Sequence, residues 1–321
     1  MPDYQRIAAE FGLGRLQAVT PLAGGRADVV RLTTAAGEFV AKPAESEAQA
    51  VLYERAARVL SEAGVRQARP WRTTAGSLIG ESGHGVQEFL PGRIFLPPTP
   101  AQTAGVMRHT GACHAVLAHV PVPPALAAQD TLFTRVASPG YLIETLPGLL
   151  HRTGLPGGAG HTVARALGLV EAFLPRMRQL PAQVVHGDIG PDNVLMDGDE
   201  VVAVIDFTPF AEPVLFAVAT ALYWYHVHGQ ATLDGRAVRA SFAAAGPRRG
   251  WARAEAAVWP VMLLREALRR LATPLALAGE PGIPVPAAVI TRYQAVRSIL
   301  RSWPYLEPAK ALSAAPGSVT I

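Results

Sequence analysis

Cysteine is almost absent from this chain, which has Cys113 as the one cysteine among its 321 residues. A single thiol excludes an intramolecular disulfide, and such usage is typical of proteins in a reducing cytoplasm. His109 and His114 lie near Cys113 in the sequence, but a helix would turn the three groups toward partly different faces. We therefore expect a packing or surface position for Cys113 rather than a metal site.

Long apolar runs are absent as well. The first ten residues, MPDYQRIAAE, contain charged side chains and no apolar core of a signal peptide. The most apolar run spans residues 213–225, whereas a helix needs about 20 apolar residues to cross a bilayer. We expect no membrane-spanning segment, and we interpret residues 213–225 as a buried helix.

Basic residues do not gather into a run, although the net charge is +4. A nucleic-acid surface needs a basic stripe interleaved with aromatic residues, and here the arginines are scattered. Hydrophobic residues make up 50% of the chain and charged residues 17%, which provides for a large core. The composition predicts a folded protein that binds neither nucleic acid nor membrane, and it specifies no oligomeric state.

The sequence also lacks the short motifs of several enzyme classes. It contains no Gly-x-x-x-x-Gly-Lys-Ser/Thr, no His-Glu-x-x-His and no Gly-x-Ser-x-Gly. These absences argue against a P-loop kinase, a zinc protease of the helix-motif type and a hydrolase with a nucleophile elbow.

A polar segment flanked by two apolar ones stands at residues 184–207. Val, Leu and Ile predict two short buried strands, and the Asp-Gly at 197–198 predicts a tight turn between them. This pairing places Asn193 across from residues 204–206, beside Asp206. Asp188 lies at the start of the loop before Asn193, so we expect three oxygen-bearing side chains to converge.

Such a group of side chains suits phosphoryl transfer. Mg²⁺ prefers hard oxygen ligands and takes one or two side chains from a protein, with water and phosphates supplying the rest. Asn193 and Asp206 fit that role. Asp188 is then left to orient a substrate hydroxyl and accept its proton, which is the division of labour in kinases. The alternative is a surface hairpin with solvated acids.

The segment His186-Gly187-Asp188 with Asn193, followed by Ile-Asp-Phe at 205–207, resembles the catalytic segment of the aminoglycoside phosphotransferase, choline kinase and homoserine kinase superfamily. The resemblance implies ATP and Mg²⁺ as cofactors, a small-molecule hydroxyl as partner, and an α+β protein-kinase-like fold. It implies a nucleotide-binding lobe over residues 1–90, built on a small antiparallel sheet, and a mainly helical catalytic and substrate-binding lobe over 91–321.

The first lobe carries the expected nucleotide contacts. Gly24 and Gly25 form a glycine turn between strands, which is either an ordinary turn or the family's phosphate-binding loop. Lys42 ends the strand 38–42 and, by the resemblance, reaches the phosphates. The helix over 45–60 then has to supply a glutamate that holds this lysine. Glu54 fits the family's spacing, and Glu47, two turns earlier, is the alternative.

Residues 78–80 and 85–90 look like the last two strands of this lobe, and Pro91-Gly92 then breaks the pattern. The resemblance makes this point the hinge, where backbone groups of Glu88, Phe89 and Leu90 contact adenine. Ordinary strand-end chemistry would select the same residues.

The second half of the chain reads as helical. We expect helices over residues 2–11, 45–60, 100–119, 162–180, 213–225, 259–271 and 287–302. One departure from the family concerns the helix after the metal-binding aspartate. Glu212-Pro213 stands where the family has an Asp-Pro turn, but Phe216 occupies the place of a second aspartate that braces the catalytic loop. This puts the bracing in doubt, not Asp188, Asn193 and Asp206.

The acceptor is less well specified. Basic residues outnumber acidic ones after Phe207, which disfavours a polycationic aminoglycoside. Residues 259–271 resemble a helix of type II homoserine kinases. Either an arginine of this segment clamps a carboxylate, or the segment is an amphipathic core helix with exposed arginines. Residues 223–225, Tyr-Trp-Tyr, form either a cation-binding wall or core. We retain a kinase for homoserine or a related amino alcohol, an antibiotic-inactivating kinase, and a catalytically silent nucleotide-binding pseudokinase.

Overall fold

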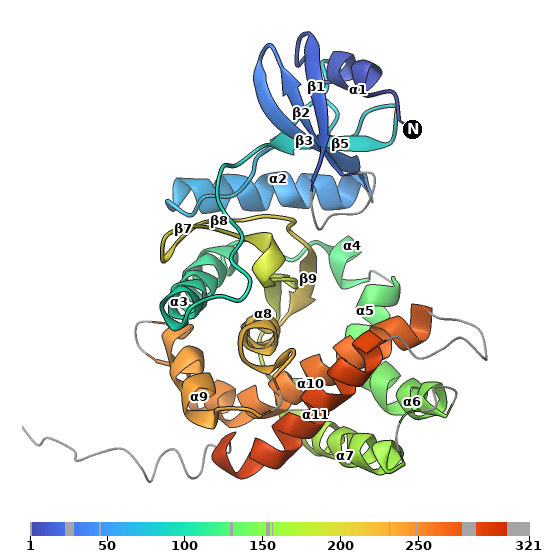
Figure 1. Cartoon of the computed structure of the whole chain (residues 1–321), viewed down its shortest axis with the longest axis vertical. Helices are drawn as coiled ribbons and strands as arrows, with labels where there is room; N and C mark the ends of the chain where they lie inside the picture. The colour runs from blue at the N-terminus through green and yellow to red at the C-terminus, as the bar shows by residue number, and fades with distance from the viewer. Residues whose placement is uncertain are drawn as a thin grey trace, which may run out of the picture.

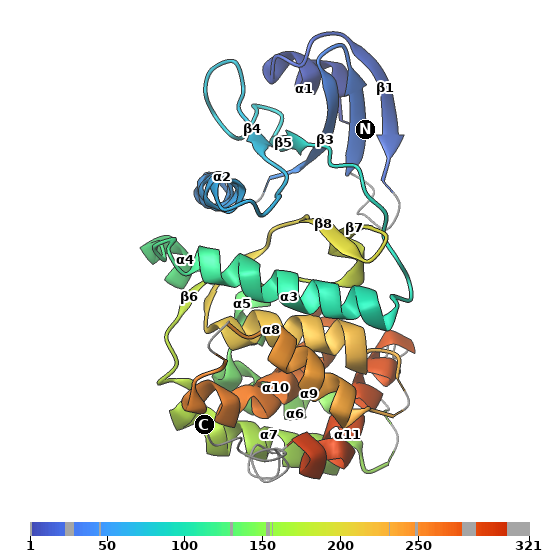
Figure 2. The same ribbon diagram turned by 90° about the vertical axis from the view of Figure 1, so that its left-hand side faces the viewer.

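The computed structural model describes residues 2–22, 29–44, 46–128, 131–151, 155, 157–230, 232–247, 250–277 and 287–306. A small sheet with two helices lies at one end of the molecule, and a larger helical part lies below it (Figure 1). Turned by 90°, the same structure shows two lobes joined by the segment after the last strand of the sheet (Figure 2). We keep the proposed lobe boundary between residues 90 and 91.

The first lobe is built on an antiparallel sheet with the order β1-β2-β3-β5-β4. In β2, residues Val30, Leu32 and Thr34 are buried while those between them are partly exposed. This period of two turns one face toward α1, where Ile7 and Phe11 complete the core. The elements are α1 (Tyr4–Glu10), β1 (Leu16–Pro21), β2 (Val30–Thr34), β3 (Gly37–Pro43), β4 (Pro70–Trp71) and β5 (His84–Glu88).

The expected strand over residues 78–80 is wrong. The Ser77 hydroxyl donates to Ile79 O and accepts from Ile79 N–H, so a side chain satisfies the backbone that a strand partner would have used. The outer strand is instead β4, which pairs with residues 86–87 of β5. Pro70 is tolerated there because β4 is the edge strand of the sheet.

Helix α2 (Glu47–Glu62) connects the two lobes. The Ser46 side chain caps it by accepting from Gln49 N–H. Leu52, Ala56 and Leu60, one helical face, share an apolar cluster with Cys113 and its neighbours in α3. Cys113 is therefore a packing residue rather than a surface one. Because this face of α2 packs on α3 and its neighbours, the two lobes are held together by an apolar contact as well as by the segment that links them.

The helical lobe surrounds one large apolar core. Its first helix begins with a capping box, in which Thr99 and Gln102 bond to one another's backbone. Its central helix, α10, is buried along most of its length (Figure 1). The helices are α3 (Pro100–Leu117), α4 (Pro124–Ala127), α5 (Leu132–Ala137), α6 (Pro139–Leu150), α7 (Ala159–Met177), α8 (Val214–Leu222), α9 (Gly235–Ala244), α10 (Arg253–Leu277) and α11 (Ala287–Leu306).

Two short two-stranded sheets carry the segment between α7 and α8, and the second of them is a hairpin. Strand β6 (Gln183–His186) pairs with β9 (Pro209–Glu212), and β7 (Val194–Asp197) pairs with β8 (Glu200–Val204). Gly198 turns β7 into β8 with φ +57°, the left-handed backbone that glycine adopts freely. Within the described residues, no helix is long and apolar enough to cross a membrane.

Candidate functional site

The catalytic loop leaves β6 at His186 and ends in a single 3-10 turn, Pro191–Asn193. Gly187 lies flat on the ring of Phe210, and any β-carbon at this position would overlap that ring. Its amide donates to Thr208 O at 2.8 Å. The glycine of the His-Gly-Asp motif is thus required by a close approach to β9, and that approach fixes where Asp188 begins.

Two buried histidines hold the loop from behind. His114 donates from Nδ1 to Thr110 O at 2.7 Å and accepts the His186 amide at Nε2 at 3.1 Å. His186 accepts the Asp188 amide at Nδ1 and donates from Nε2 to Ile205 O. Each ring uses one nitrogen as donor and the other as acceptor, so both are neutral. Burial lowers the pKa of His114 to about 4.

We expect the free energy of unfolding to fall between pH 7.5 and pH 5. The folded-state pKa of His114 lies below its unfolded value of about 6.5, so the unfolded chain alone binds a proton in this range. The loss reaches about 3 kcal/mol once the pH is below both values. Urea titrations at the two pH values measure it. His114→Gln should show a smaller fall, exposed His119→Gln the wild-type fall, and an unchanged wild-type midpoint would contradict the assignment.

Asp188 begins the catalytic loop, and its carboxylate is bonded on two sides. Arg270 Nη2 donates to Oδ1 at 2.6 Å, and Asn193 Nδ2 donates to Oδ2 at 3.3 Å and to the Asp188 carbonyl at 2.9 Å. Burial opposes the charged form, but the Arg270 guanidinium outweighs it and lowers the pKa of Asp188. The carboxylate is therefore ionised and able to accept a proton.

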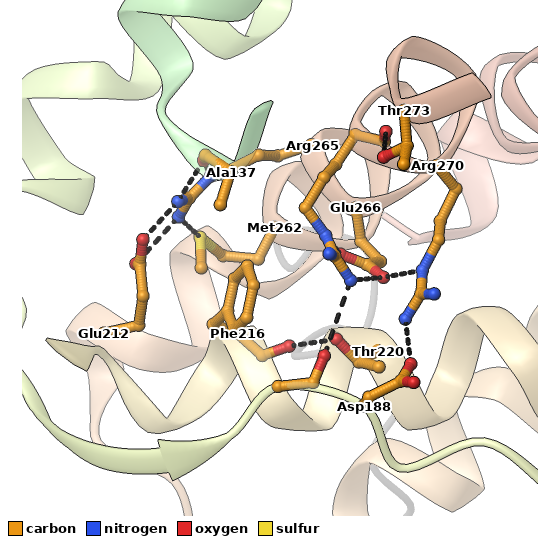
Figure 3. Close-up of polar contacts among 12 residues, drawn as sticks. Ala137, Asp188, Glu212, Phe216, Thr220, Met262, Arg265, Glu266, Arg270 and Thr273 are labelled. Carbon is orange, nitrogen blue, oxygen red and sulfur yellow. Dashed lines mark hydrogen bonds and ion pairs between the residues drawn. The ribbon is translucent and has the colours of Figure 1, made fainter. Parts of the chain in front are cut away.

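The arginine on Asp188 belongs to a buried network on α10. Glu266 accepts from Arg269 Nε at 2.6 Å and from Arg270 Nε at 2.7 Å. Burial would raise the pKa of Glu266, but the two guanidinium charges lower it overall. Figure 3 shows Arg270 beside Glu266, with its side chain extending to Asp188. Glu266 thereby fixes the direction from which Arg270 approaches the carboxylate.

Phe216, in the place of the family's second aspartate, lies beneath these arginines. The guanidinium carbons of Arg265 and Arg269 stand 5.2 and 5.3 Å from its ring centroid. Arg269 Nη2 also donates a long bond, 3.5 Å, to Gly187 O in the catalytic loop. The loop is therefore braced from below by an arginine seated on an aromatic ring.

Glu212, which stands at the expected Asp-Pro turn, forms a second buried pair. Arg265 donates to it through Nη1 at 3.0 Å and through Nη2. The same guanidinium also donates to the carbonyl of Ala137 (Figure 3). This bidentate pair ties β9 to α10, and so holds the sheet of β6 and β9 that precedes Gly187.

The register of β7 and β8 brings Asn193 to the expected place. Val194 pairs with Val204, and Ile205 N–H donates to Asn193 O at 2.9 Å. Asp206, directly after, has φ +54°, a strained left-handed backbone that turns the chain out of the strand. The hairpin geometry expected from the sequence is thus confirmed for the backbone of these residues.

Lys42 reaches the same place from the other lobe. Its Nζ donates to Asp206 Oδ1 at 2.7 Å and lies 6.0 Å from the ring centroid of Tyr53. The structure therefore brings together Lys42 and Asp206, separated by 164 residues in the sequence. Asp188 and Asn193 are hydrogen-bonded to each other in the loop before β7, the strand that pairs with β8.

The donor set fits a magnesium ion. The Asn193 amide nitrogen is committed to Asp188, which leaves Oδ1 as its free oxygen. The Asp206 side chain is 57% exposed and faces Lys42, so its second oxygen is accessible. An amide oxygen and a carboxylate are what Mg²⁺ takes from a protein when phosphates complete its shell. Among the described residues there is no cluster of three or more His, Cys, Asp or Glu for a protein-only metal site.

The expected pair between Glu54 and Lys42 is wrong for this structure. Glu54 accepts from Arg72 Nε at 2.8 Å and Nη2 at 2.5 Å, while Lys42 donates to Asp206. Tyr53, one position earlier on α2, takes the inward place and stacks on Phe207 at 5.8 Å. Glu47, the alternative, is exposed at the first position of α2.

Substituting Glu54 should therefore have a small effect. We expect Glu54→Ala to lower stability by less than about 1 kcal/mol, since the pair with Arg72 is partly exposed. The KM for the nucleotide should stay unchanged, whereas Lys42→Ala should raise it. Steady-state kinetics of the two variants compare them directly, and equal increases in KM would restore Glu54 as the partner of the lysine.

Of the three residues predicted to form the hinge, Glu88 is the last residue of β5, and Phe89 and Leu90 follow it. The Glu88 and Phe89 amides already donate to Arg69 O and Glu38 O, so adenine contacts would fall to other backbone groups of this stretch. Leu90 lies in a small apolar cluster with Ala68, Leu195 and Ala203. A purine ring binds against an apolar surface that has backbone N–H and C=O groups beside it. Gly24 and Gly25 lie outside the described residues.

Arg270 and Trp224 adjoin Asp188 and its loop, and the sequence alone assigned neither to the site. It left residues 223–225 open as a cation-binding wall or core, and the arginines of residues 259–271 open as a carboxylate clamp or an outward face. The Arg270 guanidinium carbon lies 4.7 Å from the Trp224 ring centroid, so this aromatic residue binds a cation of the protein itself. Trp224 also lies against Gly190 of the catalytic loop. The available signal was the Tyr-Trp-Tyr run at 223–225 together with the arginines of residues 265–270.

Comparison with known proteins agrees with this arrangement. Residues 18–257 match the model described as the phosphotransferase enzyme family. A homoserine kinase of Methylobacillus flagellatus is 42% identical over 93 residues, 29% of each chain. One of Bradyrhizobium sp. is 27% identical over 225 residues, 67% of this chain and 64% of that protein. The chain spans less than two thirds of the length of either relative.

Solved structures extend the likeness to the whole fold. An aminoglycoside phosphotransferase from Alicyclobacillus acidocaldarius has TM-score 0.67 and 17% identity, with 96% of both chains covered. A microcompartment-associated aminopropanol kinase has TM-score 0.69 and 13% identity, with 95% of this chain and 98% of that one covered. At such low identity they show the fold alone, and the expected α+β, protein-kinase-like bilobal architecture is confirmed.

Proposed function

The chain belongs to the phosphotransferase enzyme family, and on that premise we propose that it moves the γ-phosphate of ATP to a hydroxyl of a small molecule. The observation that carries the proposal is the ionised Asp188 carboxylate, bonded to Asn193. The Lys42–Asp206 pair crosses the cleft from the opposite lobe. The proposed acceptor is homoserine or a related amino alcohol, because the relatives are homoserine kinases and one structural neighbour is an aminopropanol kinase.

The base in this reaction is Asp188. Its carboxylate accepts the proton of the acceptor hydroxyl as that oxygen attacks the γ-phosphorus. The new O–P bond forms while the bond between the γ-phosphorus and the bridging oxygen breaks, and its electron pair leaves on ADP. Asn193 holds the second carboxylate oxygen of Asp188, which fixes the direction of the first.

The nucleotide is proposed to lie between Lys42 and the β7–β8 hairpin. Phosphate oxygens would accept from the Lys42 ammonium in competition with Asp206, and Asn193 and Asp206 would hold Mg²⁺. When bound, the ion neutralises charge on the β- and γ-phosphates. Adenine would rest on the cluster around Leu90. Gly24 and Gly25 remain proposed as phosphate-loop residues.

An assay of ADP release with a panel of acceptors tests the proposal. The panel contains hydroxy amino acids, amino alcohols and aminoglycosides, each with ATP and Mg²⁺. We expect acceptor-dependent ADP release with members of the first two groups. Release with aminoglycosides alone would favour the antibiotic-inactivating alternative. No release with any acceptor, together with tight Mg-nucleotide binding, would favour the pseudokinase.

A further inference from the structure

The acceptor side of Asp188 is lined by positive charge. Arg270 is bonded to Asp188 and Glu266 through Nη2 and Nε. Among the described residues nothing is bonded to its Nη1. Its side chain is only 13% exposed, so this nitrogen is a donor held in place beside the base.

A second arginine approaches from α11. Arg292 has a buried Nε with no hydrogen-bond partner, and it forms no ion pair with any described residue. Burial is the main cause that lowers its pKa, and the nearby charges of Arg270 and Arg269 add to this effect, while Tyr223 opposes it. Arg292 is half-buried, and a buried donor such as its Nε is costly to leave without an acceptor, which an anion would supply.

The groups around these arginines add donors, and the nearby carboxylate of Asp192, which lies beside Gly190 and Trp224, is exposed to solvent. Trp224, under Arg270, has a buried Nε1 without a partner. Burial, with Arg292 and Arg270, lowers the pKa of His228, and this ring bonds to the Tyr223 hydroxyl at 3.4 Å. Three arginines, at 269, 270 and 292, face two carboxylates, Asp188 and Glu266. The surplus is one positive charge beside the base.

We propose that Arg270 and Arg292 form an anion subsite next to Asp188, and that the acceptor is a short hydroxy acid whose carboxylate binds there. The inference rests on the proposed function and narrows its acceptor class to molecules with a carboxylate. Arg270 contacts both the base and the carboxylate, so the hydroxyl and the carboxylate of the acceptor lie a few bonds apart. Arg270 and Arg292 are specificity-determining residues, and Asp188 remains the base.

Matched acceptors test the subsite. Each hydroxy amino acid is compared with the amino alcohol that lacks its carboxylate. Homoserine is matched with 3-aminopropanol, threonine with 1-amino-2-propanol and serine with ethanolamine. A charge-assisted contact to a guanidinium predicts a preference of about 100-fold in kcat/KM for the acid. Arg292→Gln should reduce this preference about tenfold by raising the KM of the acid. The kcat/KM of the amine and the KM of ATP should not change.

Two variants control the result. Arg292→Lys keeps the charge and should recover part of the preference. Arg297→Gln removes an exposed arginine of the same helix and should behave as wild type. A rise in the KM of ATP in Arg292→Gln would assign the subsite to a nucleotide phosphate and overturn the proposal. Equal use of acid and amine by the wild type would overturn it too, while leaving the phosphotransferase function intact.

Binding measured without nucleotide separates the subsite from the reaction. Calorimetric titration with homoserine should give heat for the wild type and little for Arg292→Gln, while aminopropanol should bind both equally weakly. If no acceptor is phosphorylated but this pattern is found, the proposed function fails and the subsite stands. If homoserine binds both proteins equally, the subsite fails whatever the kinetics.

Discussion

Asp188→Asn should lower kcat by about 10³-fold while Mg-nucleotide binding stays as in the wild type. The amide keeps the shape of the carboxylate and can still contact Arg270, but it accepts no proton from the attacking hydroxyl. Arg270 keeps its bond to Glu266, so the buried network survives. Steady-state kinetics and calorimetric titration with a non-hydrolysable ATP analogue measure the two effects.

A change of the same charge on the β7–β8 hairpin serves as the control. Asp199 is exposed in the turn between β7 and β8, and Asp199→Asn should retain wild-type kinetics. Turnover of Asp188→Asn at a near-normal rate would refute the assigned base. A joint loss of turnover and nucleotide binding would show that Asp188 acts on the nucleotide instead.

Asp206→Asn should raise the Mg²⁺ concentration needed for half-maximal activity by roughly 100-fold or more. Loss of a residue that only supports a metal ligand lowers metal affinity by about 10- to 100-fold. Asp206 is itself a proposed ligand, so we expect an effect at or above the upper end of that range. The variant also removes the charge that holds Lys42 at 2.7 Å. Lys42 would then be free for the phosphates, so a loss of nucleotide affinity cannot come from the lysine. Activity titrated against Mg²⁺ at fixed ATP gives the shift.

Lys42→Ala distinguishes the role of Lys42 from that of Asp206, its ion-pair partner. It should raise the KM of ATP without moving the metal requirement, because the lysine is no metal ligand. Should Asp206→Asn show the Mg²⁺ dependence of the wild type, the metal role would pass from Asp206 to another group.

The catalytic hairpin was predictable because its signals are local. The Asp-Gly turn at 197–198 and the apolar runs on both sides predict the pairing of β7 with β8, which places Asn193 across from residues 204–206. A register shift between Leu195 and Met196, which the turn does not predict, then sets Asn193 opposite residue 205. The His-Gly-Asp motif likewise follows from a local fact, since only glycine fits against Phe210. These features need no knowledge of distant packing.

The partner of Lys42 was not predictable in the same way. Successive helix residues point about 100° apart, so a small rotation of α2 decides whether Tyr53 or Glu54 faces the lysine. Stacking of Tyr53 on Phe207 and pairing of Glu54 with Arg72 settle it. Both contacts join segments that the pattern of α2 does not contain.

The arginine network was missed for a related reason. Arg270 and Asp188 are 82 residues apart, and nothing in the local sequence distinguishes Arg270 from the other arginines of the second half. The short helices α5, α6 and α9 were also missed. Helix α6 contains Pro147 and begins with Pro-Gly, and α9 begins with Gly235, residues that read as loops. Packing of α5 on α10, of α6 on α7 and α10, and of α9 on α3 overrides that preference.

A crystal structure with Mn²⁺ and a non-hydrolysable ATP analogue tests the central claim most directly, because the anomalous signal of manganese locates the ion. The account predicts one peak within about 2.3 Å of Asn193 Oδ1 and of an Asp206 oxygen. The terminal phosphate should stand between Asp188 and the Lys42 ammonium. A manganese peak away from both residues, or a nucleotide bound outside the cleft between the lobes, would contradict it.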